Sequence, residues 1–147
     1  MTMRFRILCV ACALVLAGCS SLPSEIRNPP RDGAEFHEAV RDPDAYQGRP
    51  VRWGGEIIGV ENRDSVTWIE VLQRPLDVDG RPEDTDQTRG RYIARVEGFL
   101  DPAVYAKGRK LTTYGIIERG AEGSIGNQTY IYPMVNSERT YLWDMAD

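Results

Sequence analysis

The chain has 147 residues, of which 18 are Lys or Arg and 22 are Asp or Glu, giving a formal net charge of −4. This length suits one domain with a single hydrophobic core. An acidic chain without a cluster of basic residues is a poor candidate for binding nucleic acid, so we expect no nucleic-acid partner.

The N-terminus has the three-part pattern of an export signal. Two arginines precede an apolar run over residues 7–16, and small residues follow it. The run is about half the ~20 residues that a membrane-spanning helix needs, so it predicts a cleaved leader rather than a stable span. We therefore expect residues 1–18 to be a signal peptide, cleaved between Gly18 and Cys19.

The segment Leu16-Ala17-Gly18-Cys19 matches the lipid-attachment pattern of bacterial lipoproteins. Only a thiol can take the diacylglyceryl thioether, and small residues before it fit the signal peptidase. Acyl chains such as palmitate contribute ~0.8 kcal/mol per buried methylene group, so several chains on Cys19 would anchor the protein permanently. In lipoproteins with this kind of N-terminus, a residue other than Asp after the cysteine permits transfer to the outer membrane, and Ser20 meets that condition.

Cleavage would also change the chemistry of the mature chain. Cys9 and Cys12 leave with the leader, and lipid occupies Cys19, so neither an internal disulfide nor a cysteine metal site is expected. The 16 basic and 22 acidic residues that remain give a net charge of −6. Residues 19–32 hold three prolines and few apolar side chains, which predicts a flexible tether that lifts the domain off the membrane.

The first part of the domain combines a helix with a hairpin. Residues 33–41 place three apolar side chains on one helical face, which predicts a short helix. Residues 51–61 and 65–72 are two strand-like runs on either side of a polar turn at 62–64, which predicts a β-hairpin. Residues 77–90 are polar and rich in acidic side chains, and we expect them to form a mobile, solvated loop.

Three further strands are expected over residues 91–99, 111–118 and 129–135, with a glycine-rich linker at 120–126 between the last two. Between strands three and four, residues 101–108 begin with Asp-Pro and end with Gly, which predicts a helix. A nearly matching phrase at residues 42–51 also leads into a strand, so the two phrases are expected to share backbone geometry rather than to form two ligand sites.

Three strands, a helix and two more strands are the element order of a five-stranded OB-like barrel. We therefore predict a mainly β fold over residues 33–147, a small antiparallel OB-like barrel with one or two short helices. An open antiparallel sheet with helices on one face is the alternative.

The residues that carry enzyme chemistry are sparse. His37 is the single histidine, and the sequence holds neither a strained serine nucleophile motif nor a glycine-rich phosphate loop. Asp77-x-Asp79-Gly80 resembles the start of a calcium loop, but Thr88 stands where that loop needs a bidentate Glu. We predict no catalytic residues, no cofactor and no metal, with a hydrolase built on carboxylates as a weaker alternative.

Aromatic side chains are the remaining candidates for binding. Trp53, Trp68 and Tyr92 fall on expected strands, where they would form a ligand face for an envelope glycan or peptide. Core packing is the stronger interpretation, because most aromatic residues in small domains are buried. Trp53 and Trp68 lie on opposite legs of the first hairpin and are expected to pair across it.

Several phrases together resemble one family, the starvation-inducible outer-membrane lipoproteins of the Slp type. They are Leu16-Ala17-Gly18-Cys19-Ser20-Ser21, Tyr46-x-Gly48, Val51-Arg52-Trp53-Gly54-Gly55-x-Ile57, Glu70-Val71-Leu72, Pro75-Leu76-Asp77, Arg89-Gly90-Arg91, Gly98-Phe99-Leu100-Asp101-Pro102 and Tyr141-Leu142-Trp143. The resemblance implies an outer-membrane protein made under nutrient stress, without an established catalytic role. We expect a non-catalytic lipoprotein, anchored at the periplasmic face of the outer membrane, that acts in stress adaptation or binds an envelope partner.

Overall fold

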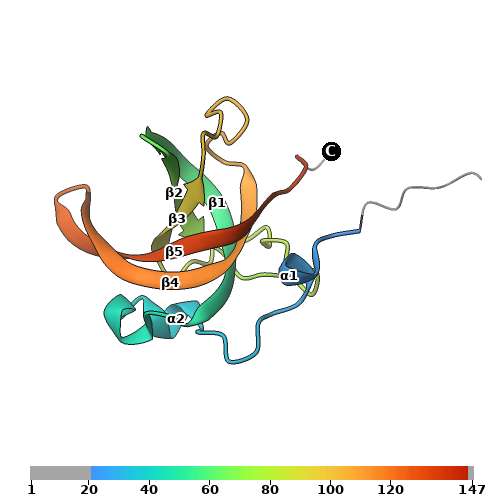
Figure 1. Ribbon diagram of the computed structural model, residues 1–147, viewed down its shortest axis with the longest axis horizontal. Coiled ribbons are helices and arrows are strands. Elements are labelled where there is room, and N and C mark those ends of the chain that lie inside the picture. Colours follow the sequence, from blue (N-terminus) through green and yellow to red (C-terminus); the bar gives the residue numbers. More distant parts are fainter. Residues whose placement is uncertain (1–20, 146–147) are drawn as a thin grey trace, which may run out of the picture.

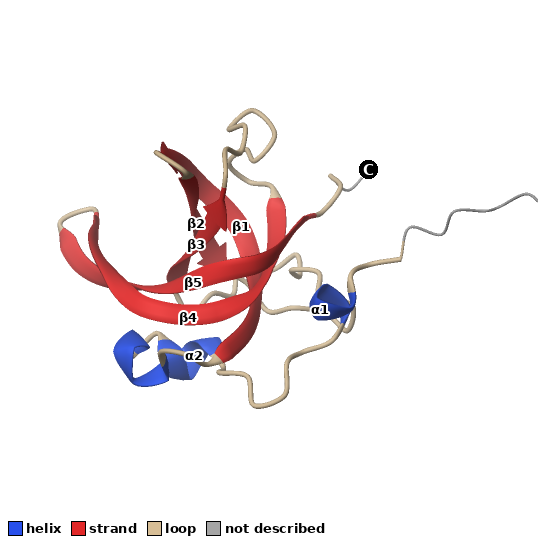
Figure 2. Cartoon of the chain, viewed as in Figure 1, coloured by secondary structure: helices blue, strands red, loops and turns tan. Residues whose placement is uncertain are grey.

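The computed structural model describes residues 21–145 and consists mainly of β-strands (Figures 1 and 2). The strands are β1 (Pro50–Arg63), β2 (Val66–Gln73), β3 (Arg91–Glu97), β4 (Lys110–Ile125) and β5 (Gln128–Leu142). The helical segments of this part of the chain are α1 (Ser24–Arg27), α2 (Phe36–Ala39) and the 3-10 helix η1 (Pro43–Tyr46). The prediction of a mainly β fold with short helices is confirmed.

The five strands form one sheet that closes in a ring in the order β1-β2-β3-β5-β4. Neighbouring strands are antiparallel except β3 and β5, which run parallel from Ile93↔Met134 to Arg95↔Asn136. The predicted wholly antiparallel sheet is therefore wrong at this pair. A ring with an odd number of strands cannot alternate direction throughout, so one pair has to be parallel.

Strand β1 belongs to two neighbours in turn. Residues 50–56 pair with β4 and residues 55–63 pair with β2, so Gly55 and Glu56 are paired on both sides. A Cβ atom on Gly55 would lie 1.9 Å from the carbonyl oxygen of Leu72, so only glycine fits this crossing. Because Trp53 pairs with β4 while Trp68 pairs with the far end of β1, the predicted contact of these two tryptophans across the hairpin is wrong.

Strands β4 and β5 are longer than expected, and the predicted linker at 120–126 is part of their hairpin. Its glycines serve close packing: a Cβ on Gly123 would lie 2.8 Å from the ring of Tyr132, and one on Gly120 would lie 2.9 Å from the side chain of Ile131. Only Gly126, at φ 58°, belongs to the connecting turn. The glycines permit strand pairing at these positions instead of ending the strand.

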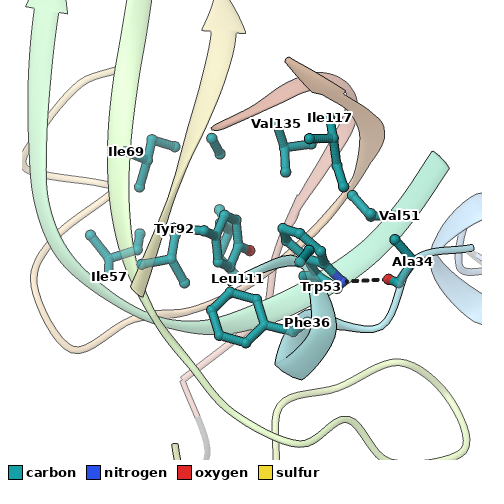
Figure 3. Close-up of a cluster of buried hydrophobic side chains, with 13 residues drawn as sticks. Ala34, Phe36, Val51, Trp53, Ile57, Ile69, Tyr92, Leu111, Ile117 and Val135 are labelled. Carbon is teal, nitrogen blue, oxygen red and sulfur yellow. Dashed lines mark hydrogen bonds between the residues drawn. The ribbon is translucent and has the colours of Figure 1, made fainter. Parts of the chain in front are cut away.

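The core lies inside the ring, where the rings of Phe36, Trp53 and Tyr92 meet edge to face or tilted, with centroids 5.0 to 6.1 Å apart (Figure 3). Nε1 of Trp53 donates a hydrogen bond to the carbonyl oxygen of Ala34 at 3.0 Å, which satisfies the one polar atom of the indole. Burying the Phe36 ring contributes about 1.5–3 kcal/mol. Helix α2 thereby closes one end of the ring.

The helix predicted at 101–108 is only a turn. Asp101 accepts the backbone N–H of Ala103 at 2.8 Å, as a capping residue would, but the chain turns back at once. The backbone N–H of Gly108 already bonds to Ile57 of β1, which leaves too few residues for a helix. The helix that closes an end of the ring is α2, which precedes the strands in the chain.

The predicted tether lies against the domain from Pro23 onward. Helix α1 buries Ile26 completely, and the Ile26 carbonyl oxygen accepts a hydrogen bond from Nη1 of Arg52 at 3.0 Å. The loop at 77–90, predicted to be solvated, also contributes: Gly80 is buried so close to Ile26 that a Cβ on it would lie 2.2 Å from that carbonyl. A segment of disorder-prone composition is therefore docked by the Ile26 side chain, the hydrogen bond from Arg52 and the close packing of Gly80.

Candidate ligand groove on the outer face of the sheet

The three aromatic residues predicted as a ligand face lie on two sides of the sheet. Trp53 and Tyr92 are 5% and 0% exposed and belong to the core inside the ring. Trp68 lies next to the fully buried Ile69 in β2, so alternation along the strand places it on the outer face. A joint face of the three residues is therefore not formed, and Trp68 alone is placed where a ligand can reach it.

The hairpin of β4 and β5 extends beyond the ring and packs on this outer face, where it builds a second, smaller apolar cluster. Its buried members are Ile93, Tyr132 and Met134, and the half-buried residues packed against them are Trp68, Ala121, Ile125 and Tyr130. The rings of Tyr130 and Tyr132 meet edge to face at 4.8 Å. The cluster fixes the hairpin relative to β2 and β3.

A groove of about 350 Å³ lies between the hairpin and the first three strands; we call it the outer groove. It is lined by Gly59, Val60, Glu61, Arg63, Trp68, Glu70, Ile93, Ala121, Glu122, Gly123, Ser124 and Tyr132. In Figure 1 the turn between β4 and β5 is at the left and α1 is at the right, so the hairpin end of the groove and the N-terminal arm around α1 (residues 23–28) lie on opposite sides of the domain. The groove combines one indole face with three carboxylates.

The indole of Trp68 is covered by a cation from its own strand pair. The guanidinium carbon of Arg63 lies 3.6 Å from the ring centroid, and the same guanidinium bonds to the Glu61 carboxylate at 3.1 and 3.3 Å. Such cation–π contacts contribute about 0.5–1 kcal/mol at exposed sites. The Trp68 face thus has both the geometry and the neighbouring negative charge that hold a cation.

The floor of the groove is ordered by Glu70. Its Oε1 accepts hydrogen bonds from Nη1 of Arg91 and from the hydroxyl of Tyr132, both at 2.9 Å. Burial, together with donation to this carboxylate, raises the pKa of Tyr132, so the hydroxyl stays protonated and keeps donating. Glu122 at the rim is exposed and forms no ion pair with any residue between 21 and 145. Arg63 offsets the charge of Glu61 and Arg91 offsets that of Glu70, so Glu122 leaves the groove with a small net negative charge.

His37 and Asp77, considered above for catalysis and for metal binding, do not line the outer groove. The one histidine, His37, is exposed on α2, away from the residues that line it. Among residues 21–145, no group of three or more His, Cys, Asp or Glu side chains is arranged to hold a metal ion. Asp77, considered above as a calcium ligand, accepts the backbone N–H groups of Asp79 and Arg81 at 2.8 and 3.0 Å and so caps its own turn.

Sequence reasoning identified Trp68 but missed Arg63 and Glu70. The alternation of β2 carries a signal for Glu70, because it shares the outer face with Trp68. Nothing local indicates Tyr132, which reaches Glu70 from a position 62 residues further along the chain. Gly18 and Cys19, predicted as the cleavage and lipidation site, lie outside the described residues.

Among residues 21–145, no helix has the length and apolar character needed to cross a membrane. Comparison with known proteins places the chain among envelope lipoproteins. The family model for the outer membrane lipoprotein Slp family matches residues 16–147, and the chain belongs to this family.

Two relatives come from Escherichia coli (strain K12). The chain is 32% identical to the outer membrane protein Slp, with 100% of this chain and 79% of the relative covered. It is also 32% identical to the uncharacterized lipoprotein YeaY, with 91% and 69% covered. An uncharacterized protein of Haemophilus influenzae is 27% identical, with 99% and 77% covered. No solved structure matches the chain significantly.

Proposed function

We propose that this chain is a non-catalytic binding module, held by lipid on Cys19 at the periplasmic face of the outer membrane, which acts in envelope stress adaptation. Membership of an outer membrane lipoprotein family supports the compartment. The pattern Leu16-Ala17-Gly18-Cys19 supports a leader over residues 1–18 and acylation of the next residue.

The anchoring is tested by growing cells with labelled palmitate. The native chain is expected to carry label and to fractionate with the outer membrane, whereas a Cys19→Ser variant is expected to carry none and to be released in soluble form. Protease added to intact cells is expected to leave the native chain intact, because the outer membrane shields its periplasmic face. Cleavage in intact cells would contradict the proposed face.

The closed sheet is proposed to be an OB-like barrel. The strand order and the single parallel pair between β3 and β5 support this assignment, as does the closure of β1 against β4. Proteins of this fold bind ligands on the face of strands two and three, between the loops that follow strands one and four. The outer groove lies on that face.

The proposed ligand of the outer groove is an envelope polypeptide with a basic side chain. The observation that carries this is the guanidinium of Arg63 over Trp68 at 3.6 Å, because it shows that the ring accepts a cation. The Glu122 carboxylate at the rim adds negative charge, and Glu61 would gain a second cationic neighbour when the ligand binds. A ligand Lys or Arg would replace Arg63 on the indole, while Arg63 stays paired with Glu61.

The test is a titration of the purified periplasmic domain with Lys- and Arg-containing peptides and, separately, with soluble peptidoglycan glycan fragments. Peptide binding is expected to be lost in Trp68→Ala and strengthened in Arg63→Ala, which removes the internal competitor. Phe99→Ala is the matched control, because Phe99 is a 73% exposed aromatic residue outside the groove. Binding of the glycan but not the peptides, or peptide binding unchanged in Trp68→Ala, would overturn the proposed ligand.

A further inference from the structure

The docked N-terminal arm limits how far the domain can stand from its anchor. Pro23 already takes part in the fold, because its carbonyl oxygen accepts the backbone N–H groups of Ile26 and Arg27 at 3.0 Å. Four residue steps separate it from Cys19, and they span at most about 14 Å. A domain of this size is more than ~25 Å across, so the end that carries α1 is held beside the lipid.

The neighbours of α1 are fixed by a chain of contacts. The Gly80 carbonyl, which belongs to the turn against Ile26, accepts a hydrogen bond from Oγ1 of Thr112 at 2.6 Å. The same Thr112 oxygen accepts Nε1–H of Trp143 at 2.9 Å. The guanidinium of Arg81 lies 5.6 Å from the Trp143 ring centroid. The 77–81 turn and the end of β5 therefore lie on the same side of the domain as α1, which agrees with Figure 1.

This side exposes apolar and basic side chains together; we call it the anchor-side face and define it by Arg27, Val78, Arg81, Lys107 and Met145. Val78 is 88% exposed and Met145 is 74% exposed, the two highest exposed fractions among the large apolar residues of the described part of the chain. Arg81, Lys107 and Met145 line one groove of about 380 Å³. Arg81 and Lys107 form no ion pair with any residue between 21 and 145.

Acidic side chains also occur on this face, and they weaken its electrostatic attraction to anionic lipid. Asp77 and Asp79 belong to the 77–81 turn and Asp144 is exposed in the same groove, so three carboxylates offset Arg27, Arg81 and Lys107, while Asp84 is paired with Lys110. The net charge of the face is therefore close to neutral, and attraction to anionic lipid is weak. Proximity does not require charge, because a lipid anchor joined to a short arm would keep this side of the domain at the bilayer surface whatever the lipid charge. Val78 and Met145 are the exposed apolar side chains on that side.

We propose that the anchor-side face rests on the headgroup layer of the membrane, with Val78 and Met145 in contact with lipid, so that the outer groove at the opposite end points away from the bilayer. This inference rests on the proposed lipidation of Cys19. It reverses the sequence-based expectation that residues 19–32 lift the domain off the membrane. The arm acts as a short mount that orients the domain.

The test uses the lipidated full chain in vesicles of phosphatidylethanolamine and phosphatidylglycerol. Single variants Val78→Cys, Met145→Cys and Ser124→Cys are labelled with an environment-sensitive fluorophore, since the acylated Cys19 is not available to the label. Lipids with a spin label in the headgroup are expected to cause a loss of emission at positions 78 and 145. Position 124, exposed at the hairpin end, is expected to keep its emission.

Two measurements separate the possible failures. Flotation of the protein with the vesicles, together with palmitate labelling, reports on the anchor itself. If the chain floats but positions 78, 124 and 145 are quenched alike or not at all, the proposed orientation is overturned while the anchoring stands. If the chain neither floats nor carries palmitate, the proposed anchoring fails, and the orientation fails with it. Vesicles of phosphatidylcholine alone are expected to give the same pattern, because the contact does not depend on lipid charge.

Discussion

Gly48 and Gly108 lie 60 residues apart in the sequence and have the same backbone conformation, with φ 89° and 90°. Each donates its N–H to the strand that faces it: Gly48 to the carbonyl of Ile117 and Gly108 to the carbonyl of Ile57, both at 2.8 Å. Each glycine thus closes one end of the pairing between β1 and β4. The similar sequences at residues 42–51 and 101–108 therefore share a backbone turn that leads into a strand.

We predict that Gly48→Ala and Gly108→Ala each destabilise the fold by about 1–2 kcal/mol, because a side chain disfavours positive φ. A Cβ atom at either position would meet nothing within 4 Å, so the cost is conformational rather than steric. Chemical denaturation with a fluorescence readout measures it. Gly59→Ala is the control: its Cβ would also meet nothing within 4 Å, but its φ is not positive, and it is expected to change stability by less than about 0.5 kcal/mol. Equal effects at all three positions would contradict this account.

The two tryptophans should respond differently to truncation. Trp53→Ala is expected to cost about 3–5 kcal/mol, because it leaves a cavity among Phe36 and Tyr92 and frees the Ala34 carbonyl. Trp68→Ala removes a half-buried ring from the smaller apolar cluster on the outer face and is expected to lower the free energy of unfolding by less. Urea unfolding of both variants measures the difference. A larger loss of unfolding free energy in Trp68→Ala than in Trp53→Ala would contradict the assignment of Trp53 to the main core.

Much of the fold could be predicted because its signals are local. Alternation of apolar and polar residues predicted the strands, and polar turn residues predicted the first hairpin. The helix at 101–108 was wrong, although Asp101 does cap its turn, because pairing of Gly108 with β1 shortens the segment. Local capping residues specify a turn but not its length.

The outer groove could not be predicted in the same way, because it depends on contacts between distant segments. Glycines in the sequence resembled a linker, yet Gly120 and Gly123 are the positions where β4 packs closely on β5. Once the hairpin is extended, it brings Tyr132 to Glu70 and encloses Trp68. The ligand face therefore follows from the pairing of two long strands rather than from a motif.

The docked arm gives a prediction about proteolysis. Ile26→Ala removes most of the side chain that holds α1 and is expected to detach the arm while leaving the ring folded. Trypsin is then expected to cleave after Arg27 and Arg31 faster than in the native chain. Glu25→Ala in the same helix, where the side chain is partly exposed, is the control and should change the rate little. An unchanged cleavage rate in Ile26→Ala would show that Ile26 does not hold the arm.

The buried phenol of Tyr92 predicts how stability depends on alkaline pH. Burial raises the pKa of Tyr92 above the ordinary ~10 of a free tyrosine, outweighing the opposite effect of its hydrogen bond to Thr113. Above pH ~10 the unfolded chain therefore releases a proton that the folded chain retains, so the free energy of unfolding falls as pH rises, whereas below that pH the contribution is constant. In Tyr92→Phe this part of the alkaline loss is expected to disappear, at a cost of about 1 kcal/mol near neutral pH for the missing hydrogen bond. Urea unfolding at a series of alkaline pH values compares the two chains. An identical pH slope in Tyr92→Phe and the native chain would mean that Tyr92 is not held neutral by the core.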